Sequence, residues 1–117
     1  VQLERRLPEH VRLRASQING CSYCVDLHSA DALKAGETQQ RINALAVWPE
    51  SSLFTARERA AFTLTESMTR VSETHVPDAD WAAAARVFSP QELGALVSLI
   101  VVINAWNGVG VSTHAWV

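Results

Sequence analysis

The sequence has few of the features that would direct it to a membrane or to nucleic acid. Its longest apolar stretch, residues 93–106, has fourteen residues and contains Ser98 and Asn104, whereas a membrane span needs about twenty. Ten Lys/Arg and twelve Asp/Glu give a net charge of −2. The cations are nearly all Arg, spread from Arg5 to Arg86 without a basic cluster. We therefore expect no membrane partner and no nucleic-acid partner.

The sequence also shows no internal repeat, low-complexity tract or linker. No charged segment followed by an apolar run resembles a leader, which favours the cytoplasm. The chain begins with Val1 rather than Met, so we expect a processed form or part of a longer chain. The 117 residues are typical of a single domain, over residues 1–117.

Helix signals recur along the chain, and strand-like alternation is nearly absent. Gly20 can stop a first helix, because glycine tolerates the left-handed conformation. Thr55 with Glu58, and Ser89 with Glu92, fit capping boxes. The pattern predicts an all-α bundle of about six helices, over residues 8–18, 21–35, 38–47, 55–72, 78–87 (capped by Asp78) and 89–106. Residues 107–110 are predicted as a turn that leads into a short tail.

The last predicted helix is apolar on almost every face. Such a helix must be buried all round, and a domain of this size offers little room to do so. We therefore expect one side of it to meet another subunit, although a central position in a monomeric bundle is the alternative. Four tryptophans are expected to pack in the core or at a subunit interface: Trp48, Trp81, Trp106 and Trp116.

The chemistry is concentrated where the only two cysteines lie. Cys21 and Cys24 form a C-x-x-C, and His28 follows four residues later. On a helix these three side chains share one face. The first interpretation is a redox dithiol: a helix N-terminus and a neighbouring imidazole both favour a thiolate, and two thiols so close can form a disulfide.

Two other interpretations remain open from the spacing alone. Cys21, Cys24 and His28 could be three zinc ligands. The fourth would have to come from another histidine, and the sequence has no second C-x-x-C and no H-x-x-x-H. The remaining histidines are His10, His75 and His114. Alternatively, both cysteines are small buried apolar residues and His28 is a hydrogen-bonded core histidine.

Residues 9–28 resemble the core motif of alkylhydroperoxidase D-like proteins of the carboxymuconolactone decarboxylase superfamily. The motif is a glutamate, eleven residues, C-x-x-C, three residues and a histidine, and Glu9, Cys21, Cys24 and His28 match all four positions. The resemblance continues through residues 34–37, 54–61 and 103–107. Family members usually carry one more helix before the motif, which we expect before Val1.

The resemblance implies an all-helical fold, assembly into trimers or hexamers, and thiol peroxidase activity without a bound cofactor or metal. Cys24 would attack a hydroperoxide and become a sulfenic acid, and Cys21 would then form the disulfide with it. Glu9 and His28 would form a proton relay to Cys24. A partner dithiol system, in some members a lipoylated protein, would reduce the disulfide again.

Helix geometry supports the same choice of Cys24. The helix dipole favours Cys21 as the more acidic thiol, but by only about 0.3–1 kcal/mol. His28 is the i+4 neighbour of Cys24, and an adjacent imidazole can lower the pKa of a thiol by several units. One position departs from some family members, because Tyr23 stands where they carry a histidine. We therefore expect slower peroxide chemistry or a different thiol-reactive substrate.

Peroxide reduction or general disulfide exchange through Cys21 and Cys24 is the leading functional hypothesis. A non-redox lyase resembling carboxymuconolactone decarboxylase is the first alternative, although such enzymes do not need a C-x-x-C. A non-catalytic redox sensor is the second. The expected partners are a small hydroperoxide, a dithiol reductant protein and further copies of the chain.

Overall fold

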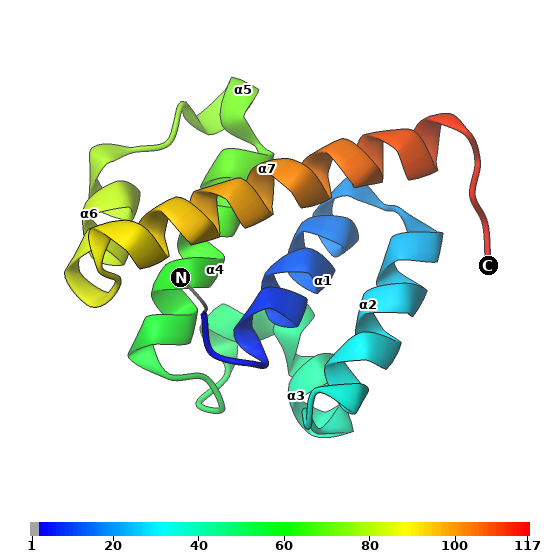
Figure 1. Ribbon diagram of the computed structural model, residues 1–117, viewed down its shortest axis with the longest axis horizontal. Coiled ribbons are helices and arrows are strands. Elements are labelled where there is room, and N and C mark those ends of the chain that lie inside the picture. The colour runs from blue at the N-terminus through cyan, green and yellow to red at the C-terminus, as the bar shows by residue number, and fades with distance from the viewer. Residues whose placement is uncertain (1–2) are drawn as a thin grey trace.

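The computed structural model describes residues 3–117, which confirm the all-α prediction (Figure 1). These residues form seven α-helices and one 3₁₀ helix. In chain order they are α1 (Leu7–Asn19), α2 (Ser22–Lys34), α3 (Gln39–Ala44), η1 (Leu45–Glu50, the 3₁₀ helix), α4 (Ala56–Thr69), α5 (Val71–Thr74), α6 (Asp78–Val87) and α7 (Pro90–Ser112).

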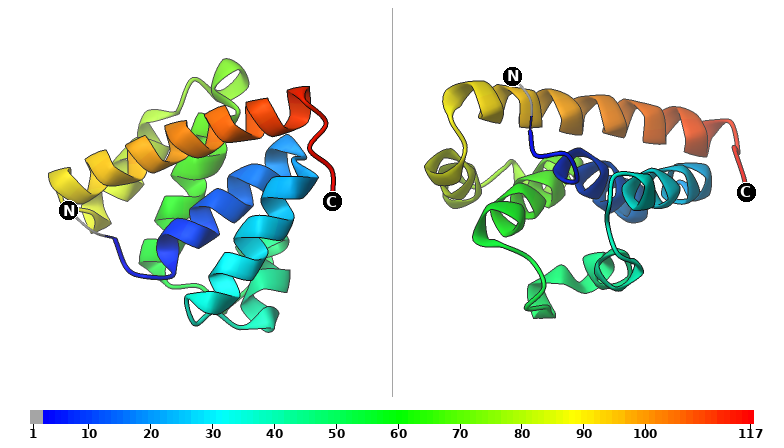
Figure 2. Two further views of the ribbon diagram at one scale, coloured as in Figure 1. Left: turned by 45° about the vertical axis from the view of Figure 1, so that its right-hand side comes forward. Right: turned by 60° about the horizontal axis from the view of Figure 1, so that its bottom comes forward.

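Helix α1 is the centre of the bundle. It packs against α2 on one side and α4 on the other, and α7 crosses over all three (Figures 1 and 2). The core lies between these helices and is made of aliphatic and aromatic side chains. Its fully buried members include Val11, Leu13, Leu45, Phe62, Leu64 and Leu96. The two halves of the sequence motif, at the start of α1 and along α2, are therefore held side by side.

The helix ends predicted from local chemistry are confirmed in three places. Gly20 ends α1 with a φ of 71°, in the left-handed region that disfavours other residues. Thr55 and Glu58 form a complete capping box at the start of α4, and Ser89 and Glu92 form another at the start of α7. Each box satisfies backbone N–H groups that a helix start leaves free.

Three other boundaries were wrong. Asp78 is the first helical residue of α6 rather than its cap, because the chain enters that helix from Pro77 without a side-chain cap. Helix α4 ends at Thr69, where the backbone turns at Arg70 before the short α5 begins. The predicted helix over 38–47 divides into α3 and η1, which has non-helical backbone angles at Val47.

The prediction of a turn at residues 107–110 was also wrong, because α7 runs straight through them to Ser112. Asn107 is held inside the bundle: its Nδ2 donates to Ser16 Oγ at 2.9 Å, and its Oδ1 accepts from Asn19 Nδ2 at 3.0 Å. These two bonds fasten the C-terminal half of α7 to the end of α1. Tertiary packing therefore overrides the weak helix propensity of Gly108 and Gly110.

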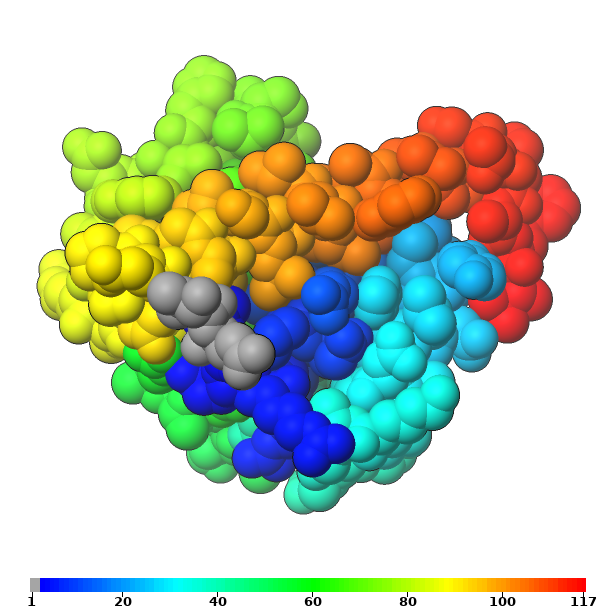
Figure 3. Space-filling view, in the orientation of Figure 1, coloured from blue at the N-terminus to red at the C-terminus, as the bar shows by residue number. Residues whose placement is uncertain are grey.

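Helix α7 buries only one of its faces within this chain. Leu96, Ile100 and Ile103 point into the core, while the outer face is open along the ridge that α7 forms in Figure 3. Five large apolar side chains of α7 are exposed within the single chain: Val101, Val102, Trp106, Val109 and Val111. By length and hydropathy alone α7 would suffice to cross a membrane, a test that core helices also pass. A subunit interface along this face stays a prediction.

Of the four tryptophans, the structure buries one. Trp48 lies in the core, and its Nε1 donates to Glu66 at 2.6 Å. Trp81, Trp106 and Trp116 are exposed within the single chain. Core packing is therefore confirmed for Trp48 only, and the other three remain available to a ligand or a second subunit.

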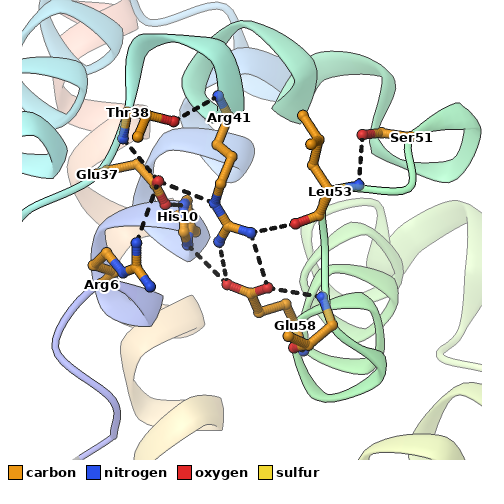
Figure 4. A network of polar contacts seen from close by, with 9 residues as sticks. Arg6, His10, Glu37, Thr38, Arg41, Ser51, Leu53 and Glu58 are labelled. Carbon is orange, nitrogen blue, oxygen red and sulfur yellow. Dashed lines mark hydrogen bonds and ion pairs between the residues drawn. The ribbon is translucent and has the colours of Figure 1, made fainter.

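A buried charged cluster fixes the rotation of α1 (Figure 4). His10 is fully buried, with Nε2 in contact with Glu37 Oε2 and Nδ1 3.8 Å from Glu58 Oε2. Arg41 bridges the two glutamates, with Nε 3.0 Å from Glu37 Oε1. Because successive residues on a helix point about 100° apart, anchoring His10 inward turns Glu9 toward α2.

The pKa values in this cluster follow from burial and charge. Burial lowers the pKa of His10 below its ordinary value, against the opposing effect of Glu37 and Glu58. Burial alone would raise the pKa of Glu37, but the N–H of Thr38, with His10 and Arg41, holds that pKa below its ordinary value. Glu37 is therefore ionised at neutral pH, and its buried charge is compensated by its neighbours.

Replacing this carboxylate should destabilise the fold in a pH-dependent way. At pH 7, Glu37→Gln should lower the free energy of unfolding by about 3 kcal/mol, because it leaves buried partners uncompensated. The pKa of Glu37 is lower folded than unfolded, so its contribution is full above about 4.5 and is lost as the pH falls further. Urea unfolding at pH 7 and pH 3 measures the difference, with the exposed Glu50→Gln as control. Equal losses at both pH values would contradict this account.

Candidate active site

The two cysteines lie at the junction between α1 and α2. Cys21 is the N-cap of α2, and its Sγ accepts a hydrogen bond from the backbone N–H of Cys24 at 3.3 Å. The N–H of Cys21 itself donates to the carbonyl of Ser16 at 3.1 Å. The tight turn at Gly20 makes this arrangement possible. The sulfurs of Cys21 and Cys24 are bonded to each other as a disulfide, with their Cα atoms 5.2 Å apart.

His28 and Glu9 form a hydrogen-bonded pair across the two helices. The Nδ1 of His28 lies 3.0 Å from Glu9 Oε2, and both side chains are mostly buried. The Nη1 of Arg12 lies 2.5 Å from the other carboxylate oxygen of Glu9. Burial alone would raise the pKa of Glu9, but the bond to His28 and the charge of Arg12 hold it below its ordinary value. Glu9 therefore keeps its charge at neutral pH and can orient the imidazole through Nδ1.

A pocket of about 440 Å³ opens between α2 and the C-terminal half of α7. Cys24 and His28 both line it, whereas Cys21 does not. The remaining lining residues are Arg12, Tyr23, Leu27, Val102, Ile103, Trp106, Val109, Gly110, Thr113 and Ala115. Cys24 is only 5% exposed and Cys21 only 2%. A small molecule in the pocket thus reaches the disulfide from the Cys24 side.

The wall of this pocket depends on Gly110. A Cβ atom added at this position would lie 2.6 Å from Cys21 Sγ and 3.4 Å from Cys24 Sγ, closer to the first than packing allows. The backbone of α7 therefore passes directly over the disulfide. The hydrogen bonds of Asn107 to Ser16 and Asn19, one turn earlier, hold it there.

The four residues of the motif are thus brought together, with different surroundings. The pocket is lined by Cys24 and His28, and Glu9 is bonded to His28 without lining the pocket itself. Cys21 lies beneath α7, next to Gly110. No hydrogen bond joins His28 to either sulfur within residues 3–117. Tyr23, at the departure from the family pattern, is half exposed and lines the pocket.

The ligands proposed for a zinc ion do not converge in this structure. The two sulfurs are bonded to each other, and His10 is buried against Glu37 and Glu58. His75 and His114 are exposed, at the end of α5 and beyond α7. A different group, formed by Glu9, His28 and Asp31, places one donor atom of each within 4.8 Å of the others. Glu9 in that group is already paired with Arg12.

Sequence reasoning missed Arg12, Asp31 and Gly110 as members of the site. Arg12 and Asp31 each stand three residues after a motif residue, a spacing that places them on the same helix face. That signal was present but is common on any helix. Gly110 lies 86 residues from Cys24 along the chain, and no local pattern indicates that the two meet.

A methyl group at Gly110 should disturb the site, and the same change at Gly108 should not. Gly110→Ala should lower the stability of the oxidised protein by about 1–3 kcal/mol, because the new Cβ collides with the disulfide. Gly108 has open space around its Cβ position in the same helix, so Gly108→Ala should raise stability by about 0.5–1 kcal/mol. Chemical unfolding of both variants measures this. Equal effects would show that α7 does not press on the disulfide.

Comparison with known proteins places the chain in a family. Residues 1–67 match the model of the Carboxymuconolactone decarboxylase family. The uncharacterized protein YdfG of Bacillus subtilis (strain 168) is 36% identical over 110 residues, which cover 94% of this chain and 75% of that protein.

A solved structure agrees with this assignment. The crystal structure of ATU0492 from Agrobacterium tumefaciens, a protein of unknown function proposed there as the antioxidant defence protein AhpD, is similar with a TM-score of 0.92. Sequence identity is 37%, and the match covers 94% of this chain and 75% of that chain. The chain therefore belongs to the carboxymuconolactone decarboxylase family, as one of its alkylhydroperoxidase D-like proteins.

Proposed function

We propose that the protein is a thiol peroxidase that reduces organic hydroperoxides through Cys21 and Cys24. The observation that carries this proposal is the pocket in which Cys24 and His28 share one wall while Glu9 holds the imidazole from behind. A redox pair, a base and an entrance for a small molecule therefore meet at one place. The family and the similar AhpD-type structure support the same chemistry.

The reaction begins in the reduced protein. The Cys24 thiolate attacks the distal oxygen of ROOH, the O–O bond breaks, and RO⁻ takes a proton to leave as ROH. Cys24 is then a sulfenic acid. The Cys21 thiol attacks its sulfur, the S–O bond breaks, and water leaves as the disulfide forms. An external dithiol returns two electrons and two protons by thiol–disulfide exchange and becomes a disulfide itself.

Two features of the structure compete for the choice of attacking sulfur. As the N-cap, Cys21 Sγ accepts the Cys24 N–H and lies at the positive end of α2, which favours a Cys21 thiolate. Cys24 lines the pocket with His28, and Cys21 is covered by Gly110. The base decides between them, because His28 lines the pocket with Cys24, whereas the separate hollow that Cys21 borders holds no histidine. We assign the attack to Cys24 and disulfide formation to Cys21.

His28 and Glu9 supply the proton chemistry in this proposal. With Nδ1 bonded to the Glu9 carboxylate, Nε2 is left as the ring nitrogen that can exchange a proton with Cys24 or with the departing alkoxide. Glu9 acts through His28, since it stabilises the imidazolium and fixes the orientation of the ring. In the proposed relay, His28 thus exchanges the proton and Glu9 orients His28.

The partners follow from the same chemistry. We propose that a dithiol reductant protein reduces the disulfide and that the protein acts in the cytoplasm. We further propose that α7 contributes to the interface of a trimer or hexamer through exposed apolar side chains outside the pocket, such as Val101 and Val111, which are otherwise left in water.

Thiol titration with one equivalent of hydroperoxide tests the assigned roles. The wild-type protein should lose two thiols per chain. Cys21→Ser should lose its single thiol, because the sulfenic acid still forms at Cys24. Cys24→Ser should retain its thiol after the wild type has lost both of its own. Loss from Cys24→Ser at the wild-type rate would remove Cys24 from its assigned role.

The relay is tested by the rate of thiol oxidation as a function of pH. Glu9→Gln should lower the second-order rate constant about tenfold, as expected for one lost hydrogen bond to a charged group. The lowered pKa of Glu9 means that the wild-type carboxylate is charged from neutral pH down past 4.5. The deficit of the variant should therefore be present at pH 7 and shrink in acid, where the wild-type carboxylate is protonated as well. Glu73→Gln, exposed on α5, is the control, and a Glu9→Gln rate equal to that control would refute the relay.

A further inference from the structure

The walls of the pocket at Cys24 are mostly apolar. Helix α2 contributes Leu27, and α7 contributes Val102, Ile103, Trp106 and Val109. Within the single chain Ile103 is buried, whereas the other four side chains are in large part exposed, with Trp106 at 63%. A volume of about 440 Å³ is in the range of sites for small organic ligands. Hydrogen peroxide would fill little of it and would leave the apolar walls in water, whereas an organic ligand would cover them.

One fixed charge lines this pocket, and it is positive. Arg12 is the single Lys or Arg among the lining residues, and no Asp or Glu is among them. Its Nη1 is bonded to Glu9, but its Nε and Nη2 have no hydrogen-bond partner within residues 3–117. The side chain is 35% exposed, so the free edge of the guanidinium is open to a ligand. That planar edge offers two parallel N–H groups, the geometry that a carboxylate accepts best.

We propose that the ligand of this site is an amphipathic organic acid, namely a hydroperoxide with an apolar body and a carboxylate that binds Arg12. The proposal rests on the proposed function, since it names the substrate class of the same site. The apolar body packs against Leu27 and the α7 wall, and Arg12 binds the carboxylate. The hydroperoxide group then meets Cys24 and is reduced to the alcohol by the steps given above.

Binding to the oxidised protein tests the ligand class without any chemistry. Octanoate is ionised at neutral pH, and 1-octanol is its uncharged counterpart of the same length. Titration calorimetry should show octanoate binding about tenfold more tightly, the effect of a charge-assisted hydrogen bond. Each added methylene from hexanoate to decanoate should tighten binding by up to about fourfold, because it buries further apolar surface. Leu27→Ala, at a half-exposed position, should reduce that dependence on length.

Variants at Arg12 separate the carboxylate contact from general hydrophobic binding. Arg12→Gln should bind octanoate and 1-octanol equally, and Arg12→Lys should keep part of the preference because it keeps the charge. Arg5→Gln, which changes an exposed arginine away from the pocket, should keep all of it. Equal binding of octanoate and 1-octanol by the wild type would overturn the proposal, as would a preference that survives in Arg12→Gln.

Kinetics then distinguish a wrong ligand class from a wrong function. With a fatty-acid hydroperoxide, its methyl ester and hydrogen peroxide as oxidants, kcat/KM should be highest for the acid, about tenfold lower for the methyl ester, and lowest for hydrogen peroxide. Comparable kcat/KM for all three would refute the ligand class and leave the peroxidase function standing. Preferential binding of octanoate through Arg12 with no reduction of any hydroperoxide would refute the peroxidase function and leave the ligand class standing.

Discussion

The contact between α7 and the disulfide is the constraint on which the rest of the site depends. Because Gly110 has no side chain, the backbone of α7 can lie directly over the sulfurs of Cys21 and Cys24. That approach covers Cys21, and it also brings the apolar side of α7 opposite α2, which forms the pocket. The absence of a side chain at Gly110 thus allows both the close cover over Cys21 and the formation of the pocket at Cys24.

The second constraint is the orientation of α1. His10 is anchored in the interior by Glu37 and Glu58, and its neighbour Glu9 consequently faces His28 on α2. The buried cluster contributes no residue to the pocket at Cys24 and takes no part in the proposed chemistry. Its contribution is to fix the direction of one carboxylate, because a rotation of α1 would separate Glu9 from the imidazole. Helix α1 therefore carries both a stabilising residue, His10, and a residue of the proposed relay, Glu9.

The sequence was most informative where the governing interactions are local. Capping boxes at Thr55 and Ser89 and the left-handed Gly20 are decided within a few residues, and all three were predicted correctly. The motif from Glu9 to His28 could also be identified from the sequence, since its residues lie close together in the chain, on two adjacent helices and the turn between them. The prediction of a turn at residues 107–110 was wrong for the opposite reason. Two glycines indicate a turn locally, but contacts with residues of α1 and with the disulfide, far away in the chain, keep them helical.

The central claim is that Cys24, beside His28 and facing the pocket, is the more reactive of the two thiols. Alkylation of the fully reduced protein by iodoacetamide over a range of pH, followed by peptide mass spectrometry, measures the reactivity of each cysteine separately. The account predicts that Cys24 reacts first, with an apparent pKa below the value of about 8.5 for a free cysteine, and that Cys21 is protected beneath α7. Faster alkylation of Cys21, with its pKa the lower of the two, would contradict it.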